Sequence, residues 1–152
     1  MASIGVLVRR WPRVAAAVSF GAVGSFFPAT WFLPSVLSRR DGVAFILFIV
    51  LPGLASAVSG ALAGIALCDP ARNISQGNAA LRGAVVATLA LLIFAPTFAV
   101  FFTLTAPGQT NVLAMTILVL QFSLLTIWWI AAPVGGAVGW LLHHIASGQD
   151  LS

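Results

Sequence analysis

Long apolar segments separated by short polar connectors dominate this sequence. Crossing the hydrocarbon core of a bilayer takes about 20 mainly apolar residues in helical form. The apolar runs are continuous, and they lack the alternation of apolar and polar residues that marks a membrane β-barrel. The pattern therefore predicts an all-α, polytopic integral membrane protein, with a single membrane domain over 1–152 and four transmembrane helices at 14–37, 42–67, 81–105 and 112–145.

The composition agrees with this prediction and restricts the partners. Hydrophobic residues make up 61% of the chain and charged residues 7%, which is outside the usual range of soluble domains. The net charge of +4 would favour nucleic acid in a soluble protein. Here the arginines flank the apolar segments, where anionic lipid headgroups are their natural partners. We therefore expect the lipid bilayer and other membrane protein subunits as partners, and no nucleic acid.

The distribution of arginine predicts the orientation of the chain. In membrane proteins the flanks and loops richer in arginine and lysine lie in the cytoplasm. Arg39 and Arg40 lie in the first connector, and the other five arginines belong to the opposite side. This predicts a multi-pass protein of a bacterial inner (cytoplasmic) membrane with both termini in the cytoplasm. The five arginines on that side are candidates for docking a partner or binding lipid headgroups: Arg9, Arg10, Arg13, Arg72 and Arg82.

The first thirteen residues form a separate amphipathic pattern. Ile4, Leu7, Val8 and Trp11 recur at helical spacing, and the nearby arginines are available for the polar side. This predicts a short interfacial helix within 1–13, lying on the cytoplasmic leaflet. A signal peptide is disfavoured because the apolar residues come before the arginines.

The fourth segment is longer than one upright crossing requires. A helix over 112–145 would measure about 51 Å at 1.5 Å per residue, whereas the hydrocarbon core is about 30 Å thick. Either the helix is tilted and projects from the membrane, or it breaks near 131–136, at Pro133, and leaves 137–146 as an interfacial helix.

The connectors have sequences typical of turns. Pro107 and Gly108 predict a turn, after which Thr110 or Asn111 can cap the next helix. The longest polar stretch predicts a loop after Asp69, with the helix restarting at Ala79.

Residues able to support catalysis or bind a metal are scarce. No segment places an ionisable residue near its middle, where proton relays and ion-coupled transporters usually need one. The single cysteine, Cys68, has no second thiol with which to build a zinc site. We therefore expect neither an enzyme nor a metal site.

His143 and His144 are the candidate cofactor-binding residues. As neighbours in a helix they point about 100° apart, so they are not expected to hold one metal together. The simpler interpretation is a pair of interfacial histidines at the end of a helix. The alternative is that one of them is an axial ligand to a tetrapyrrole pigment or haem at a subunit interface.

Small residues recur at four-residue intervals in two segments. In lipid, close backbone approach along such stripes brings helices together. The stripes predict helix-packing positions at Ser56, Gly60 and Gly64 and at Ala131, Gly135 and Gly139.

These observations favour a non-catalytic accessory or structural subunit of a larger bacterial membrane protein complex, packing through its small-residue stripes. One alternative is a small transporter or channel built from proline-kinked helices. A second alternative is a pigment- or haem-binding membrane subunit.

Overall fold

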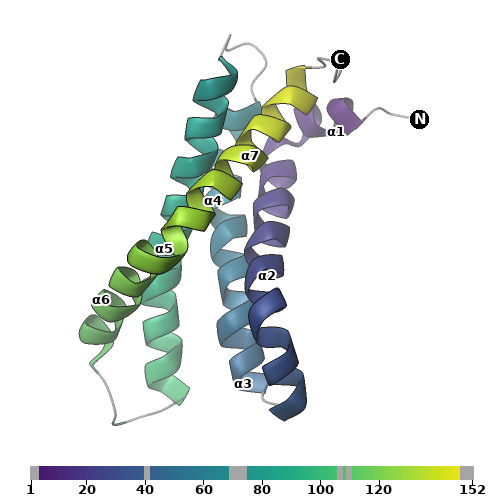
Figure 1. The fold of residues 1–152 in the computed structure, drawn as a ribbon. Helices are drawn as coiled ribbons and strands as arrows, with labels where there is room; N and C mark the ends of the chain where they lie inside the picture. The colour runs from purple at the N-terminus through teal and green to yellow at the C-terminus, as the bar shows by residue number, and fades with distance from the viewer. Residues whose placement is uncertain (1–3, 40–41, 69–74, 106–107, 109–110, 148–152) are drawn as a thin grey trace.

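The computed structural model describes residues 4–39, 42–68, 75–105, 108 and 111–147. Within these ranges the chain is helical and contains no strand, in agreement with the predicted all-α class. The helices form two antiparallel hairpins that pack side by side (Figure 1). Arg72, one of the predicted docking or headgroup-binding arginines, lies outside the described residues.

The first hairpin pairs α2 with α4. A short helix, α1 (Ile4–Arg10), bends at Trp11 into α2 (Pro12–Arg39). The return helix consists of α3 (Gly42–Phe45), a π-helical turn η1 (Ile46–Val50) and α4 (Leu51–Cys68). Pro52, the second residue of α4, lacks the N–H that would pair with a carbonyl one turn earlier, which accounts for the local widening.

The second hairpin pairs α5 (Gln76–Thr105) with a long arm. The arm consists of α6 (Val112–Phe122), a π-helical turn η2 (Ser123–Ile127) and α7 (Trp128–Ser147). Asn111 caps α6, because its side chain accepts a hydrogen bond from the N–H of Leu113 at 2.9 Å. The prediction of a cap at this place is confirmed, whereas α5 begins at Gln76, three residues before the expected start at Ala79.

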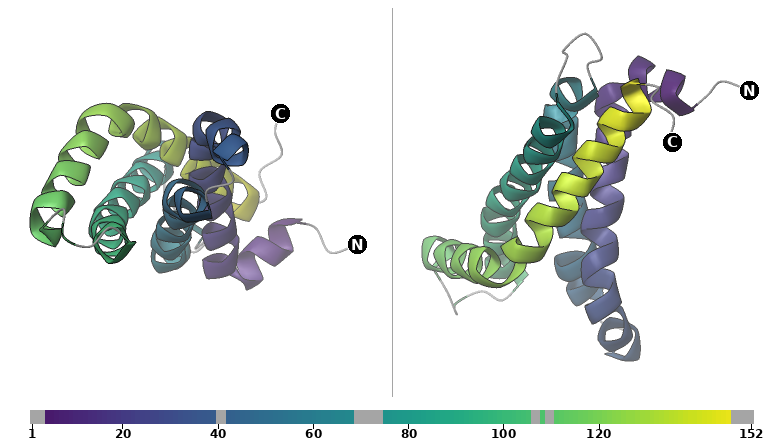
Figure 2. Two further views of the ribbon diagram at one scale, coloured as in Figure 1. Left: turned by 90° about the horizontal axis from the view of Figure 1, so that it is seen from below. Right: turned by 45° about the horizontal axis from the view of Figure 1, so that its top comes forward.

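The expected break near 131–136 is wrong. The helix α7 runs through Pro133 to Ser147, and the arm changes direction at η2, where α6 turns away from the line of α7 (Figure 2). Pro133 removes one backbone hydrogen bond from α7, which kinks a helix without ending it when neighbouring turns are held by packing. Gly135 and Gly136 provide that packing, since both are buried against α5.

Two clusters of buried side chains hold the bundle together at its two ends. At the end where α1 and the last turns of α7 lie, the helices approach closely (Figure 1). At the opposite end, phenylalanine rings separate them, and Phe98 contacts Phe48, Phe94 and Phe102 with centroid distances of 5.5 to 6.0 Å. The first cluster contains Val8, Ala16, Phe20, Leu67, Val86, Leu142 and Ala146, and the second contains Leu47, Leu51 and Phe98.

Among the residues that the structure describes, three helices are long and apolar enough to cross a membrane: Gly42–Leu67, Gln76–Thr105 and Val112–Ser147. They correspond to three of the four predicted spans. The remaining predicted segment lies in α2, which is helical over 28 residues. All four predicted segments are therefore helical, whereas three of them are long and apolar enough to cross a membrane.

Candidate functional site

The small residues predicted in the first hairpin lie between α2 and α4. A Cβ atom added to Gly60 would lie 2.6 Å from the carbonyl oxygen of Ala16, and one added to Gly64 would lie 2.6 Å from that of Pro12. Ser56 lies against Gly24 of α2, so closely that a Cβ on this glycine would overlap the serine side chain. The stripe therefore faces another helix of the same chain.

The small residues of the second hairpin form a similar contact between α5 and α7. A Cβ atom on Gly139 would lie 2.7 Å from the carbonyl oxygen of Ala79, and one on Gly83 would overlap the carbonyl oxygen of Gly135. Ala131, the first member of this stripe, is half-buried one turn before Gly135. The glycines of both stripes therefore face helices of the same chain.

Arg82 has an intramolecular partner. Its Nη1 atom donates a hydrogen bond to the carbonyl oxygen of Ala66 at 2.7 Å, and the side chain is partly buried. Ala66 lies in the last turn of α4, where carbonyl groups lack helical partners and a positive charge is favourable. Arg82 thus links α5 to the end of α4.

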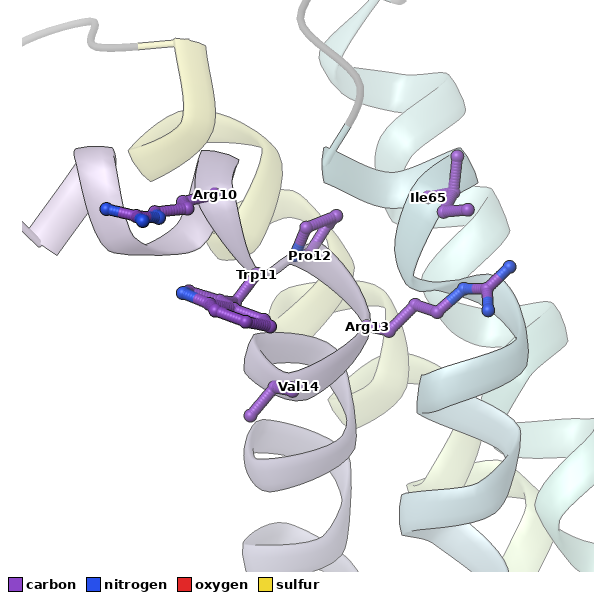
Figure 3. A pocket seen from close by; sticks show the side chains of 6 residues that line it. All are labelled: Arg10, Trp11, Pro12, Arg13, Val14 and Ile65. Carbon is purple, nitrogen blue, oxygen red and sulfur yellow. The ribbon is translucent and has the colours of Figure 1, made fainter.

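The three arginines near the start of the chain are exposed. Arg9 and Arg10 end α1, and Arg13 lies in the first turn of α2. Arg10 and Arg13 line a hollow of about 160 Å³ at the bend between the two helices (Figure 3). The sequence predicted the interfacial pattern here, but not a concave surface.

The two histidines are buried, with 9% of His143 and 8% of His144 exposed. The Nδ1 atoms of both and the Nε2 atom of His144 are buried without a hydrogen-bond partner. The ring of His144 stacks on Trp140, with centroids 5.4 Å apart and planes 17° apart. The simpler expectation placed both histidines at the interfacial end of a helix, and His144 does lie in the last turn of α7, against which α1 packs.

An apolar groove of about 810 Å³ runs between α5 and α7. Small residues, including Ala80, Ala84 and Gly136, form its base, and Trp128, Trp129 and Trp140 line it as well. The indole N–H of Trp128 donates a hydrogen bond to the Thr88 hydroxyl at 3.0 Å, which fixes one side of the groove. Nothing in the sequence singled out Trp140, because its place beside the groove depends on how α7 packs.

The described part of the chain contains no group of three or more histidine, cysteine, aspartate or glutamate residues that could hold a metal ion. The described residues form packed apolar helices, an apolar groove between α5 and α7, and a small hollow at the bend between α1 and α2.

The fold defines a helical protein with three helices able to cross a membrane, and its apolar outer surface indicates contact with a lipid bilayer. Comparison of the chain with protein families, with curated proteins and with solved structures found no match.

Proposed function

We propose that this chain is a non-catalytic subunit of a larger membrane assembly in the inner membrane of a bacterium. The observation that carries the proposal is the poor cover of the first part of the arm, where α6 has no buried residue. In its most apolar stretch, 11% of the arm is buried, against 33% for Gly42–Leu67 and 28% for Gln76–Thr105. A partner helix packed on the arm would give it the cover that the other helices receive from their own chain.

The bend at η2 adds support. It turns α6 out of the line of α7, so that α6 has no buried residue of its own (Figure 2). In lipid, helices associate through close packing because hydrocarbon already solvates their apolar surface. The helix α6 packs against α5 but has no buried residue, so its exposed side would gain contact energy if a neighbouring subunit packed against it.

The proposed topology has four crossings, with α2 as the additional one. Its 28 residues extend about 42 Å at 1.5 Å per residue, which is enough to span the hydrocarbon core. The end of the bundle that carries Arg9, Arg10, Arg13 and Arg82 would face the cytoplasm, since cytoplasmic flanks are enriched in arginine. The end of α7 lies on the same side, which would place both termini there (Figure 1).

Site-specific photo-crosslinking in native membranes tests the proposal. Leu125 of the arm and Leu62 of α4 form a matched pair, because 75% and 74% of their side chains are exposed. A photoreactive residue at Leu125 should give one discrete adduct with a different polypeptide, and the same residue at Leu62 should give none. Equal yields at both positions would contradict the proposal, as would solute transport by the purified chain in liposomes.

A tetrapyrrole-binding subunit is the second candidate, and His144 favours it. Burying polar nitrogens without hydrogen bonds costs about 1–3 kcal/mol each, so a ligand for them would have a stabilising effect. Trp140, against which His144 stacks, also lines the groove, so one side chain contacts both the imidazole and the groove.

The absorption spectrum of the complex extracted in mild detergent tests this candidate. We expect a visible chromophore in the wild type, its loss in His144→Phe and its retention in His143→Phe. A colourless wild-type complex would rule the candidate out.

A further inference from the structure

We propose that α1 lies in the interface of the cytoplasmic leaflet and inserts one apolar face, formed by Ile4, Leu7 and Trp11, at the boundary between headgroups and acyl chains. The partner of this face is a lipid surface. The sequence predicted an interfacial helix here, and the structure adds its direction and the side that its own chain leaves open. The inference rests on the membrane placement given under the proposed function, and it does not require the partner subunit.

The helix α1 runs across the end of the bundle and not along it. Figures 1 and 2 show it beside the last turns of α7, extending outward from the start of α2. It contacts both of these helices, and Val8, which the sequence pattern grouped with Ile4, Leu7 and Trp11, is buried in the core of the bundle. With the bundle crossing the bilayer, α1 therefore lies close to the plane of the leaflet, at the depth where α2 enters it.

One side of α1 is apolar and exposed. Ile4, Leu7 and Trp11 are all exposed, and at about 100° per residue they lie within about 60° of one another around the helix axis. Trp11 continues this face because its N–H donates a hydrogen bond to the carbonyl of Leu7 at 2.9 Å. Large apolar side chains gathered on one face are typical of helices that lie in a membrane interface.

The charged residues of α1 lie away from this face. By helical spacing Arg9 is almost opposite its centre and Arg10 lies at its edge, and both are exposed. An interfacial helix carries arginine on its polar side, where the guanidinium groups reach headgroups and water while the apolar side meets acyl chains. This distribution of charge fits the surface of a leaflet, which is polar above the helix and apolar below it.

The apolar face of α1 continues into the outer surface of α2. Figure 3 shows the indole of Trp11 below α1 and beside α2, on the same side of the bend as Val14. Val14 and, one turn later, Val18 are exposed. Tryptophan is enriched at the membrane interface, where its ring meets acyl chains and its N–H meets headgroups. The surface that α2 would present to acyl chains therefore extends to the side of α1 that faces the bilayer.

The depth of a nitroxide spin label in liposomes tests the proposal. The purified chain carries Cys68→Ser and one introduced cysteine for labelling, and it is reconstituted at low density in liposomes of phosphatidylglycerol and phosphatidylcholine. Collisions with oxygen, which concentrates in lipid, and with a water-soluble nickel chelate report the depth of the label. The label at Leu7→Cys should lie about 5–10 Å into the boundary between headgroups and acyl chains.

Val6→Cys provides the matched control. Val6 and Leu7 are neighbours in α1 and are each 53% exposed, so the chain itself shields the two positions equally. Val6 lies toward Arg9, and its label should remain in water. Val18→Cys is the reference for the span, and its label should lie deeper than the one at Leu7. Circular dichroism verifies the helical fold of each labelled chain; should Leu7→Cys not fold, Ile4→Cys on the same face replaces it with the same expected depth.

Three outcomes would overturn the proposal. Labels at Leu7 and Val6 at equal depth, or a Leu7 label in water above a Val18 label in lipid, would mean that α1 does not lie in the interface. A Leu7 label shielded from both oxygen and nickel would mean that a second copy of the chain covers the face. A Val18 label in water would remove the membrane placement of α2 and this inference with it. Because the isolated chain is used, these failures are separate from failure of the crosslink at Leu125.

Discussion

The two hairpins of this protein differ in how far their helices stay together. In the first hairpin, close backbone contacts extend from Gly64 near Pro12 to Gly53 near Gly21, so α2 and α4 remain side by side. In the second hairpin, similar contacts are confined to the end where Gly139 meets Ala79. Beyond η2 the arm still contacts α5, but α6 has no buried residue, so the close packing through small residues covers α7 better than α6.

At the end opposite α1, large side chains replace small ones. Phe32 stacks on Phe48 at 4.7 Å, and Phe98 continues this set of ring contacts to α5. The contact between Phe48 and Phe98 joins the two hairpins through side chains rather than through backbone atoms. The comparison therefore separates two kinds of contact, backbone packing within each hairpin and aromatic packing between them.

The largest expected effect comes from removing the aromatic link between the hairpins. Phe98→Ala deletes a buried ring and should lower the free energy of unfolding by about 3–5 kcal/mol. Reversible unfolding in mixed micelles containing dodecyl sulfate measures it. Phe26→Ala, at an exposed position of α2, should change stability by less than about 0.5 kcal/mol, and an equal loss there would break the comparison.

Overpacking of the second hairpin should have the next largest effect. Gly83→Ala introduces a Cβ into the backbone of α7 at Gly135 and should cost about 1–3 kcal/mol. Gly77 of the same helix has open space around it, so Gly77→Ala should leave stability unchanged or raise it slightly. If both variants unfold at the same dodecyl sulfate concentration, α5 and α7 are not in backbone contact.

Loss of the link between the hairpins at Arg82 should cost less. Arg82→Gln removes the hydrogen bond to the Ala66 carbonyl and should lower stability by about 1 kcal/mol, since the side chain is only partly buried. Hydrogen exchange should rise in the last turn of α4. Uniform exchange rates in wild type and variant would show that this contact does not hold α4 to α5.

The smallest expected effect on stability concerns the hydrogen bond that Trp128 makes at the start of α7. Trp128→Phe removes the hydrogen bond to Thr88 and should cost about 0.6 kcal/mol, the average for such bonds between membrane helices. A double-mutant cycle with Thr88→Val isolates the pair. A coupling energy of zero would mean that packing alone holds the arm at this point.

The sequence predicted the helical segments well because their apolar character is local and continuous. Asn111 was also predictable as a cap, since its side chain acts on a backbone group two residues away. For the fourth segment the sequence left two alternatives, a tilted helix or a break near 131–136 at Pro133, whereas the arm changes direction at η2, which contains neither proline nor glycine. Its position depends on how α6 and α7 pack, and no local pattern reports that.

The candidate sites were less predictable for the same reason. The arginines and histidines were visible as residue types, but the burial of His144 depends on α1 folding back onto α7. The hollow beside Arg10 and Arg13 arises from the bend at Trp11 together with Ile65, about fifty residues later in the chain. Contacts between such distant segments are set by the tertiary fold.

The mass of the particle that leaves the membrane in mild detergent tests the central claim most directly. We predict that the wild-type chain of 15.8 kDa is extracted together with at least one different polypeptide. Leu125→Trp, which enlarges the uncovered face of the arm, should release the chain from it, and Leu62→Trp should not. A wild-type chain that leaves the membrane alone, or an assembly that Leu125→Trp and Leu62→Trp affect equally, would contradict the account.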